Sequence, residues 1–573
     1  KKQNFSLPLV INFPMKILIF LFLINLHSIF SQGSVMMVGG GGENYNAWSD
    51  EPYGWFVEKA GYGKIINIDV DESSDWYPSY FVSLGANITS HNLQIATEAD
   101  ANSFTIYQEL LSANGIFIEG GDQWDYVSTW KNTYVQAAIQ TVYENGGAIG
   151  GTSAGLAVLG EVVFDGENGS LTSDQAAYNP YHYRVSMTDD FLDILPGVFT
   201  DSHFNERGRL GRLAIMLARR IQDNDDDLLG IGVEYKTALC VDENMIGTVH
   251  GEMVTIIHQS DSSEIQCIVN EPTRFTNIVF NQLLDGDQYD LSSREFVGAG
   301  NWTDSFQLEI ITQPIFTEMT LNGSEDSTAD FGQYVITGLT ENENNWWYGD
   351  LGIEDGSGLV PHAVIIPKIW NDYDYFPNRI IGGEFGVVGE NTGFSAYEDQ
   401  PFRTIYLDDN CESTISDDGI LTVDNLTYVL DVFEASHTGT NNDNMPSIVN
   451  GRLHFLIDGD TFDLSSHYDF VSVDGDPNQI PEKIALFQNY PNPFNPMAMI
   501  KYDLPKLTHV SLIIYDLNGK EIQTLVNEKQ NQGKKHVAWM GLNDQGKPMP
   551  TGLYFYRLET PEFSKSFKMV YLK

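Results

Sequence analysis

The chain has 573 residues, more than a single hydrophobic core normally holds, so about three domains are expected. Its 31 Lys and Arg against 79 Asp and Glu give a formal net charge of −48, which argues against nucleic acid and anionic membranes as partners. Only three cysteines occur, so neither a disulfide framework nor a cysteine-based metal site can be read from the sequence.

Residues 1–32 are predicted to be a secretory signal peptide with an upstream extension. Met15-Lys16 precedes a short apolar run at 17–24, and small or polar residues follow at 28–32. The run is too short to span a bilayer comfortably. We therefore expect the mature protein to begin near Gln32.

Residues 33–293 have the pattern of an α/β domain with a parallel sheet. Short apolar segments alternate with helix-like stretches, and Gly-rich turns follow the apolar segments. The predicted strands are 35–38, 65–69 and 116–119, and the predicted helices include 103–111 and 133–143. Because sites gather at the C-terminal ends of parallel strands, the loops 39–43 and 120–123 should meet the turn at Ser153.

The turn at Ser153 lies in a Gly-x-Ser-x-Gly sequence spanning Gly151–Gly155. An apolar run precedes it and a helix start follows, which is the pattern of a nucleophile elbow that exposes a serine hydroxyl. Glycines are needed on both sides because a Cβ would clash in so tight a turn. An ordinary Gly-rich strand-to-helix turn is the alternative.

Residues 201–213 hold one histidine and three arginines in an otherwise acidic chain. His203 can serve as the general base that a serine nucleophile needs. Arg209 and Arg212 are three positions apart, share a helix face and can grip a carboxylate. The alternative is that these arginines form structural ion pairs.

Four motifs occur in order: Gly120-Gly121-Asp122-Gln123, Gly151–Gly155, the string at 201–213 and Gly230-Ile231-Gly232-Val233-Glu234. Together they resemble the cyanophycinase family of serine peptidases, relatives of dipeptidase E, over residues 33–293. The resemblance implies a flavodoxin-like three-layer α/β fold, like the glutaminase domain of class I amidotransferases. It also implies hydrolysis next to aspartyl residues; cyanophycinases release β-Asp-Arg dipeptides from cyanophycin, a polyaspartate carrying arginine.

Carried over by position, the resemblance makes Ser153 the nucleophile and His203 its base. The backbone N–H groups of Gly121 and Ala154 would form the oxyanion hole. The residues implied to bind the charged groups of the substrate are Gln123, Asp201, Arg207, Arg209 and Arg212.

The chain departs from the family at two points. Ser202 stands where the family usually has Gln, so part of the substrate contact should differ. Glu234 is followed by Tyr235 where the family has a second acid, so the group that orients His203 is open. We expect Glu234 to fill that role, with Glu161 and Asp174 as rivals.

Residues 294–480 are predicted to be a β-rich, degenerate copy of the second half of the first domain. Residues 283–293 recur at 456–466, residues 233–261 have a counterpart at 407–436, and residues 195–198 resemble 360–363. The copy has no elbow serine, catalytic histidine or arginine string, and should pack against the first copy or extend the substrate surface. An unrelated β-rich insert is the alternative.

Residues 481–573 differ in charge, with 12 Lys and Arg against 8 Asp and Glu. Short alternating strands with regular turns predict a small Ig-like β-sandwich. Three features resemble the C-terminal sorting domain of the bacterial type IX secretion system: residues 491–496, the Asn518-Gly519-Lys520 turn and the Gly552-Leu553-Tyr554 strand. This implies export through the periplasm and across the outer membrane by that machinery, followed by release or surface attachment. An ordinary Ig-like accessory domain is the alternative.

The leading hypothesis is a secreted serine peptidase that cleaves cyanophycin or related aspartyl-linked peptides. The alternatives are an exopeptidase for short aspartyl peptides and a catalytically weak surface protein that binds charged polymers. We expect no cofactor and no metal, since the acidic run at 223–227 lacks the spacing of a calcium loop. A homodimer is compatible with each hypothesis.

Overall fold

The computed structural model describes four parts of the chain, with short gaps. They are 32–298 without 72–73 and 205–206; 316–366 without 323, 325, 338–351 and 356; 403–465 without 409–410, 434, 436 and 441–445; and 483–571 without 487–497, 518, 531–532, 540, 545–546 and 548. Residues 1–31 of the predicted leader (1–32), the segment at 491–496 and Asn518 of the predicted turn lie outside these residues. Within the described parts, no helix is long and apolar enough to cross a membrane.

The first sheet contains the predicted parallel strands. Its order is β16-β15-β11-β10-β1-β5-β4-β2-β3, and the strands from β1 to β3 in that order run parallel. Their bounds are β1 Ser34–Val38, β2 Ile65–Asp69, β3 His91–Gln94, β4 Gly115–Ile118 and β5 Ala148–Thr152. The antiparallel extension comprises β10 Ala238–Val241, β11 Ile246–His250, β15 Gln288–Asp290 and β16 Glu295–Gly298.

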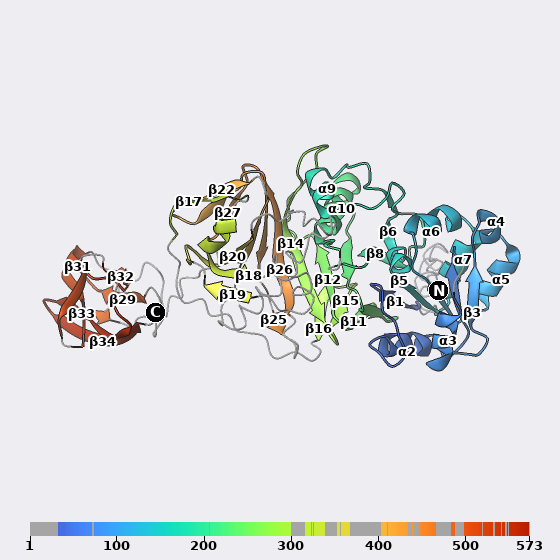
Figure 1. Ribbon diagram of the computed structural model, residues 1–573, viewed down its shortest axis with the longest axis horizontal. Helices are drawn as coiled ribbons and strands as arrows, with labels where there is room; N and C mark the ends of the chain where they lie inside the picture. The colour runs from blue at the N-terminus through green and yellow to red at the C-terminus, as the bar shows by residue number, and fades with distance from the viewer. Residues whose placement is uncertain are drawn as a thin grey trace, which may run out of the picture. The chain divides into compact units, whose positions relative to one another are not determined.

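Helices cover both faces of this sheet (Figure 1). The aromatic residues of α2 (Asp50–Lys59) and α3 (Trp76–Ser83) pack on one face, around Phe117. Residues of α5 (Phe104–Leu111), α6 (Gln123–Trp130) and α7 (Tyr134–Glu144) pack on the other, with α4 (Glu98–Ala101) beside α6. Strands that are apolar on both faces are what a doubly covered parallel sheet requires.

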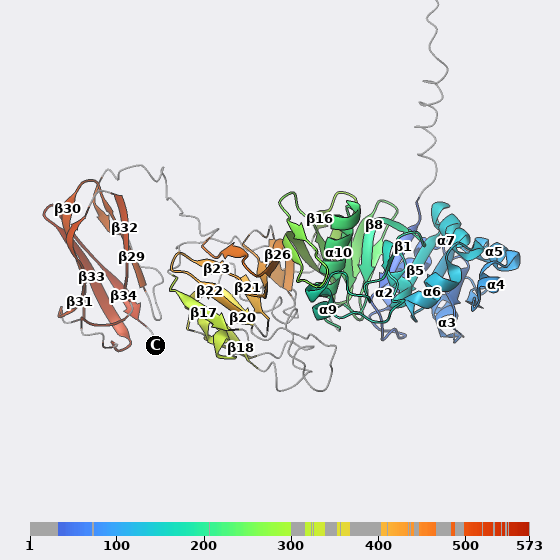
Figure 2. The same ribbon diagram turned by 90° about the horizontal axis from the view of Figure 1, so that it is seen from above.

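After β5 the chain passes through the short helix α8 (Ala154–Ala157) into a second sheet, which the sequence did not predict. The strands that this part of the chain contributes are β6 Gly160–Phe164, β7 Met187–Thr188, β8 Leu195–Asp201, β9 Leu229–Val233, β12 Met253–His258, β13 Ile265–Gln266 and β14 Arg274–Leu284. Figure 2 shows α10 (Leu210–Asn224) against these strands, and α9 (Ser173–Tyr178) packs on α10.

The second sheet continues beyond β14 into the later part of the chain. Its order is β19-β18-β20-β21-β24-β26-β14-β12-β9-β8-β6-β7, and Figure 1 shows β26 beside β14. The added strands are β18 Gly332–Thr337, β19 Gly352–Asp355, β20 Val360–Ile366, β21 Arg403–Leu407, β24 Leu426–Asp431, β25 His437–Thr440 and β26 Pro446–Ile457. A small separate sheet contains β17 Met319–Asn322, β22 Glu412–Ile415, β23 Ile420–Thr422 and β27 Thr461–Asp463, and a 3-10 helix spans Asp326–Phe331.

The C-terminal unit has its own core, formed between two sheets around the buried Trp539. One sheet has the order β28-β29-β32 and the other β31-β30-β33-β34. The strands are β28 Ala485–Leu486, β29 Ala498–Leu504, β30 Thr508–Tyr515, β31 Glu521–Gln530, β32 Gly533–Trp539, β33 Gly552–Thr560 and β34 Phe563–Tyr571. Two sheets around one core form the β-sandwich that the sequence predicted.

Candidate active site

Ser153 stands between β5 and α8 in a strained backbone conformation. Its φ of 54° and ψ of −113° lie in a region that residues with a Cβ rarely occupy, at a cost of about 1–3 kcal/mol. The flanking glycines make the turn feasible. A Cβ on Gly151 would lie 2.3 Å from the Gly155 carbonyl oxygen, and one on Gly155 would lie 2.2 Å from that of Ile118. The Gly-x-Ser-x-Gly pattern thus follows from close backbone packing.

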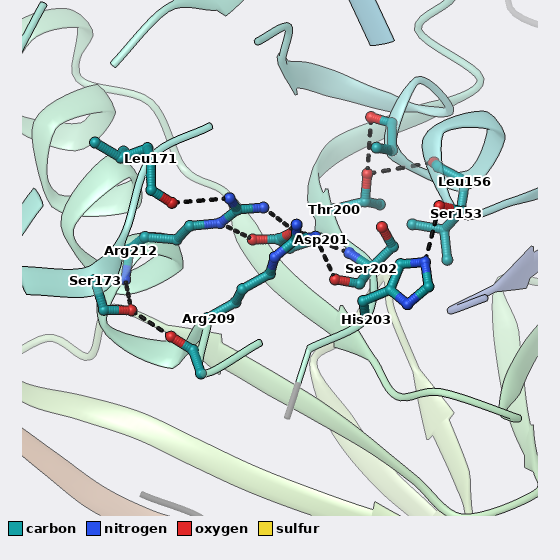
Figure 3. A network of polar contacts seen from close by, with 12 residues as sticks. Ser153, Leu156, Leu171, Ser173, Thr200, Asp201, Ser202, His203, Arg209 and Arg212 are labelled. Carbon is teal, nitrogen blue, oxygen red and sulfur yellow. Dashed lines mark hydrogen bonds and ion pairs between the residues drawn. The ribbon is translucent and has the colours of Figure 1, made fainter. Parts of the chain in front are cut away.

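The Ser153 hydroxyl meets the His203 imidazole at the C-terminal ends of β5 and β8. The distance from Ser153 Oγ to His203 Nε2 is 2.9 Å (Figure 3). The His203 N–H donates to the Gly39 carbonyl at 2.8 Å, and a Cβ on Gly40 would lie 2.4 Å from the imidazole ring. The loop after β1 therefore supports the histidine closely enough to fix its ring.

The two predicted oxyanion donors lie in segments that adjoin Ser153. Ala154 is the first residue of α8, and the Gly120-Gly121 loop approaches so closely that a Cβ on Gly120 would lie 3.3 Å from the Ser153 Cβ. The Tyr126 hydroxyl lies 3.0 Å and 3.2 Å from the carbonyl oxygens of Glu119 and Gly120, which steadies this loop. The oxyanion-hole role itself stays a prediction.

Asp201 lies at the end of β8, two residues before His203, and is 2% exposed. Arg212, 1% exposed, donates from Nε at 2.7 Å and from Nη2 at 2.6 Å to the two oxygens of this carboxylate. Arg209, 8% exposed, donates to Asp201 Oδ1 at 3.1 Å and to the Ser202 carbonyl at 2.6 Å (Figure 3). These contacts favour the structural ion pairs that the sequence left as an alternative.

The charge state of this cluster follows from burial and pairing. Burial favours the neutral acid, yet the Arg212 and Arg209 guanidinium groups outweigh it, so the pKa of Asp201 lies below its ordinary value. Burial, with the neighbouring Arg212 charge, lowers the pKa of Arg209 to about 9. Asp201 and Arg209 are therefore both ionised at neutral pH.

Two other predicted substrate contacts are open to solvent. Arg207 is exposed on the turn after His203, and its backbone N–H donates to the His203 carbonyl at 3.1 Å. Gln123 is partly exposed at the start of α6, where Asp122 caps the helix by accepting from the Trp124 N–H at 2.9 Å. Their substrate contacts stay predictions.

The candidate third member of the triad is buried under the loop after β1. Glu234 Oε1 accepts from the Tyr235 N–H at 2.8 Å, and a Cβ on Gly39 would lie 1.9 Å from the Glu234 carbonyl oxygen. The rivals contact other groups: Glu161 Oε2 accepts from the Gly197 N–H at 2.7 Å, and Asp174 accepts from the Thr172 hydroxyl.

Sequence reasoning assigned no role to Glu43, which lies beside the nucleophile strand. Its Oε1 accepts from Thr152 Oγ1 at 3.1 Å and from the Tyr53 hydroxyl at 3.0 Å. The available signal was its place in the loop after β1, the strand that pairs with β5. Glu43 therefore places a carboxylate close to the Ser153 turn, in addition to the exposed guanidinium of Arg207 on the turn after His203.

In the described part of the chain, no group of three or more His, Cys, Asp or Glu side chains is arranged to hold a metal ion. Cys240, Cys267 and Cys411 are buried and free.

Comparison with known families finds matches to two parts of the chain. Residues 71–249 match the model of Peptidase family S51, and this segment contains both Ser153 and His203. Residues 499–561 match the model of the FlgD Ig-like domain. The S51 match and the relatives below support a serine-type peptidase.

Several curated relatives of this chain are cyanophycinases, and the chain spans less than two thirds of the length of the first of them. The cyanophycinase of Synechococcus elongatus is 32% identical over 208 residues, which is 35% of this chain and 61% of that protein. The cyanophycinase of Geminocystis herdmanii is 27% identical over 227 residues, 39% of this chain and 78% of that protein. A solved peptidase structure from an acI-B1 actinobacterium is 21% identical, with a TM-score of 0.32, and the match covers 45% of this chain and 97% of that one.

Proposed function

We propose that this protein is a secreted serine peptidase that hydrolyses cyanophycin or related aspartyl-linked peptides. The observation that carries the proposal is the 2.9 Å contact between Ser153 Oγ and His203 Nε2 on a strained elbow. Activation of a serine by a neighbouring imidazole is the chemistry this geometry serves. The similarity to cyanophycinases supports the substrate class.

The reaction proceeds in two steps. Ser153 Oγ attacks the carbonyl carbon while its proton passes to His203 Nε2, and the N–H groups of Ala154 and Gly121 stabilise the oxyanion. The C–N bond then breaks and the leaving amine takes the proton from His203. In the second step water attacks the acyl ester, His203 accepts the water proton and returns it to Ser153, and the acid product leaves.

The site's surroundings suit a substrate that carries both signs of charge. Arg207 offers an exposed guanidinium after His203, and Glu43 offers a partly exposed carboxylate beside Thr152. A β-Asp-Arg unit has a free carboxylate and a guanidinium, so one group of each sign in the protein can orient it.

The test is digestion of insoluble cyanophycin by residues 33–573, with product masses measured in the soluble fraction. We expect Asp-Arg dipeptides, and no release by Ser153→Ala or His203→Gln variants that keep the wild-type melting temperature. Faster cleavage of short aspartyl peptides than of polymer would assign the exopeptidase function instead. Polymer binding without any hydrolysis would leave a binding protein and overturn the peptidase proposal.

We also propose that residues 481–573 direct export by the type IX machinery, because their sequence carries the Asn-Gly-Lys and Gly-Leu-Tyr patterns that resemble such sorting domains. Deletion of residues 481–573 in a host with that machinery should retain the protein in the periplasm. Unchanged release into the medium would contradict this role.

A further inference from the structure

The strands β14 and β26 carry the same local pattern, 173 positions apart in the chain. The Leu284 N–H donates to Asp287 Oδ2 at 2.8 Å, and the Ile457 N–H donates to Asp460 Oδ2 at 3.1 Å. Each strand ends in the same aspartate-stabilised turn. We therefore treat residues of β14 and β26 that differ by 173 as counterparts.

The pairing between the two strands obeys a two-fold symmetry. Phe275 pairs with Phe455, the counterpart of Gln282, and Gln282 pairs with Ile448, the counterpart of Phe275. The pairs Ile278 with Leu453 and Phe280 with Gly451 are related in the same way. Val279 pairs with its own counterpart, Arg452, so a pseudo-two-fold axis passes between these two residues. A contact that is self-complementary about such an axis is typical of a symmetric dimer.

Two hydrogen bonds that involve side chains across this seam follow the same symmetry. The Asn277 N–H donates to His454 Nδ1 at 3.3 Å, and the Asn450 N–H donates to Asn281 Oδ1 at 2.9 Å. Asn277 and Asn450 are counterparts, and so are Asn281 and His454. Both asparagines adopt a positive φ, 52° and 62°, at the irregularities in the pairing.

The strand registers away from the seam repeat as well. Asp201 pairs with Gly232 between β8 and β9. Their counterparts in the copy, Ile366 and Tyr406, pair with each other between β20 and β21. In the same way, Ile246 pairs with Asp290 between β11 and β15, and their counterparts Ile420 and Asp463 pair between β23 and β27. The strand order on one side of the seam is β14-β12-β9-β8-β6-β7, and on the other β26-β24-β21-β20-β18-β19.

One part of the first domain has no counterpart. Val35 of β1 pairs with Val241. Met319 of β17 pairs with Ile415, which is the counterpart of Val241, so β17 corresponds to β1. The short stretch from Asn322 to Gly332 leaves no room for β2 to β5. The copy therefore lacks β5, the strand that presents Ser153.

We propose that residues 319–465 act as the second subunit of an internal dimer. Their strand β26 covers the edge of β14, an 11-residue strand that would otherwise expose its backbone for pairing with a second copy of this chain. The protein is then a monomer with one active site, rather than the homodimer that the sequence allowed. This inference does not depend on the proposed peptidase activity.

The test uses residues 33–573 in light scattering and in cysteine cross-linking on the pseudo-two-fold axis. We expect the mass of one chain. The Val279→Cys, Arg452→Cys double variant should be joined within one chain by mild oxidation or by a short bismaleimide, and the joined peptides should be recovered by mass spectrometry. The Val279→Cys and Arg452→Cys single variants are the matched controls and should stay monomeric under both reagents.

Two results would overturn the internal dimer. One is a covalent dimer of the Val279→Cys variant, or a native mass of two chains that the variant Val279→Pro in β14 abolishes, because β14 edges would then pair between molecules. The other is failure of both reagents to join the two cysteines in the double variant, although each thiol reacts with a small maleimide after unfolding.

Discussion

Ser153 Oγ lies 2.9 Å from His203 Nε2, although both residues have a positive φ, 54° and 46°. Each conformation is unfavourable for a residue with a Cβ, so the surrounding backbone must hold both. For Ser153 that hold comes from Gly151 and Gly155, and for His203 it comes from Gly39 and Gly40. The proposed reactive pair is thus held in place by glycine backbones.

Replacement of Ser153 by glycine should raise the free energy of unfolding by about 1 kcal/mol, because glycine adopts this backbone conformation without steric cost. Ser153→Ala keeps the Cβ and serves as the control, with little change expected. Urea unfolding of both variants measures the difference. Equal stability of the two variants would show that the serine backbone is not strained.

Gly155→Ala should lower the free energy of unfolding by about 2 kcal/mol or more, because its Cβ would meet the Ile118 carbonyl oxygen at 2.2 Å. The matched control is Gly54→Ala, in the middle of α2, where nothing lies within 4 Å of the new Cβ. That variant should gain roughly 0.5–1 kcal/mol from helix propensity. Thermal unfolding would contradict the packing argument if both variants shifted in the same direction.

Asp201→Asn should cost roughly 3 kcal/mol at pH 7, because two buried guanidinium groups lose their shared carboxylate. The folded-state pKa of Asp201 is lowered, so its charge stabilises the fold above the unfolded pKa of about 3.9 and this stabilisation is lost as pH falls through the folded value. The stability gap between wild type and variant should therefore narrow below about pH 4. A gap that stays constant from pH 7 to pH 3 in urea titrations would argue against the ion pair.

Arg207→Ala should raise KM for a zwitterionic substrate roughly 10-fold and change stability by less than about 0.5 kcal/mol, because the residue is exposed. Arg212→Lys is the comparison: it loses two of its three donor contacts and should reduce stability and kcat with little effect on KM. Steady-state kinetics separates the two roles. A rise in KM alone for Arg212→Lys would return Arg212 to the substrate site.

Glu234→Gln should reduce kcat by roughly 10²–10⁴-fold if Glu234 orients His203. The Glu161→Gln variant should stay within a few-fold of wild type, since Glu161 binds the Gly197 N–H. Labelling of Ser153 by a fluorophosphonate gives a readout that needs no peptide substrate. Equal labelling rates in the two variants would remove Glu234 from the triad.

Sequence periodicity predicted the parallel strands β1, β2 and β4 and the helices α5 and α7 to within one residue at each end. The predicted strand at 65–69 is β2, and the predicted helix at 133–143 is α7, Tyr134–Glu144. Strands buried on both faces are apolar throughout, and the elbow glycines are required by local backbone packing. Both signals are local, so a single sequence carries them.

The sequence could not show which of Arg207, Arg209 and Arg212 form structural ion pairs and which are free to contact a substrate. The spacing of Arg209 and Arg212 places them on one helix face, but which partner they meet depends on where β8 delivers Asp201, and that is tertiary information. The second sheet was missed for a related reason. Its strands are separated in the chain by helices and loops, and only their pairing shows that they leave the first sheet at α8.

The pairing of β14 with β26 also bears on how the protein is made. During synthesis β14 is complete well over a hundred residues before β26 emerges, so for that time its edge is open to wrong partners. Contacts this distant in sequence form slowly, because a long loop must close first. The emerging chain should therefore be most prone to aggregate just before residue 446 is added, and a chaperone that shields strand edges would act in that interval.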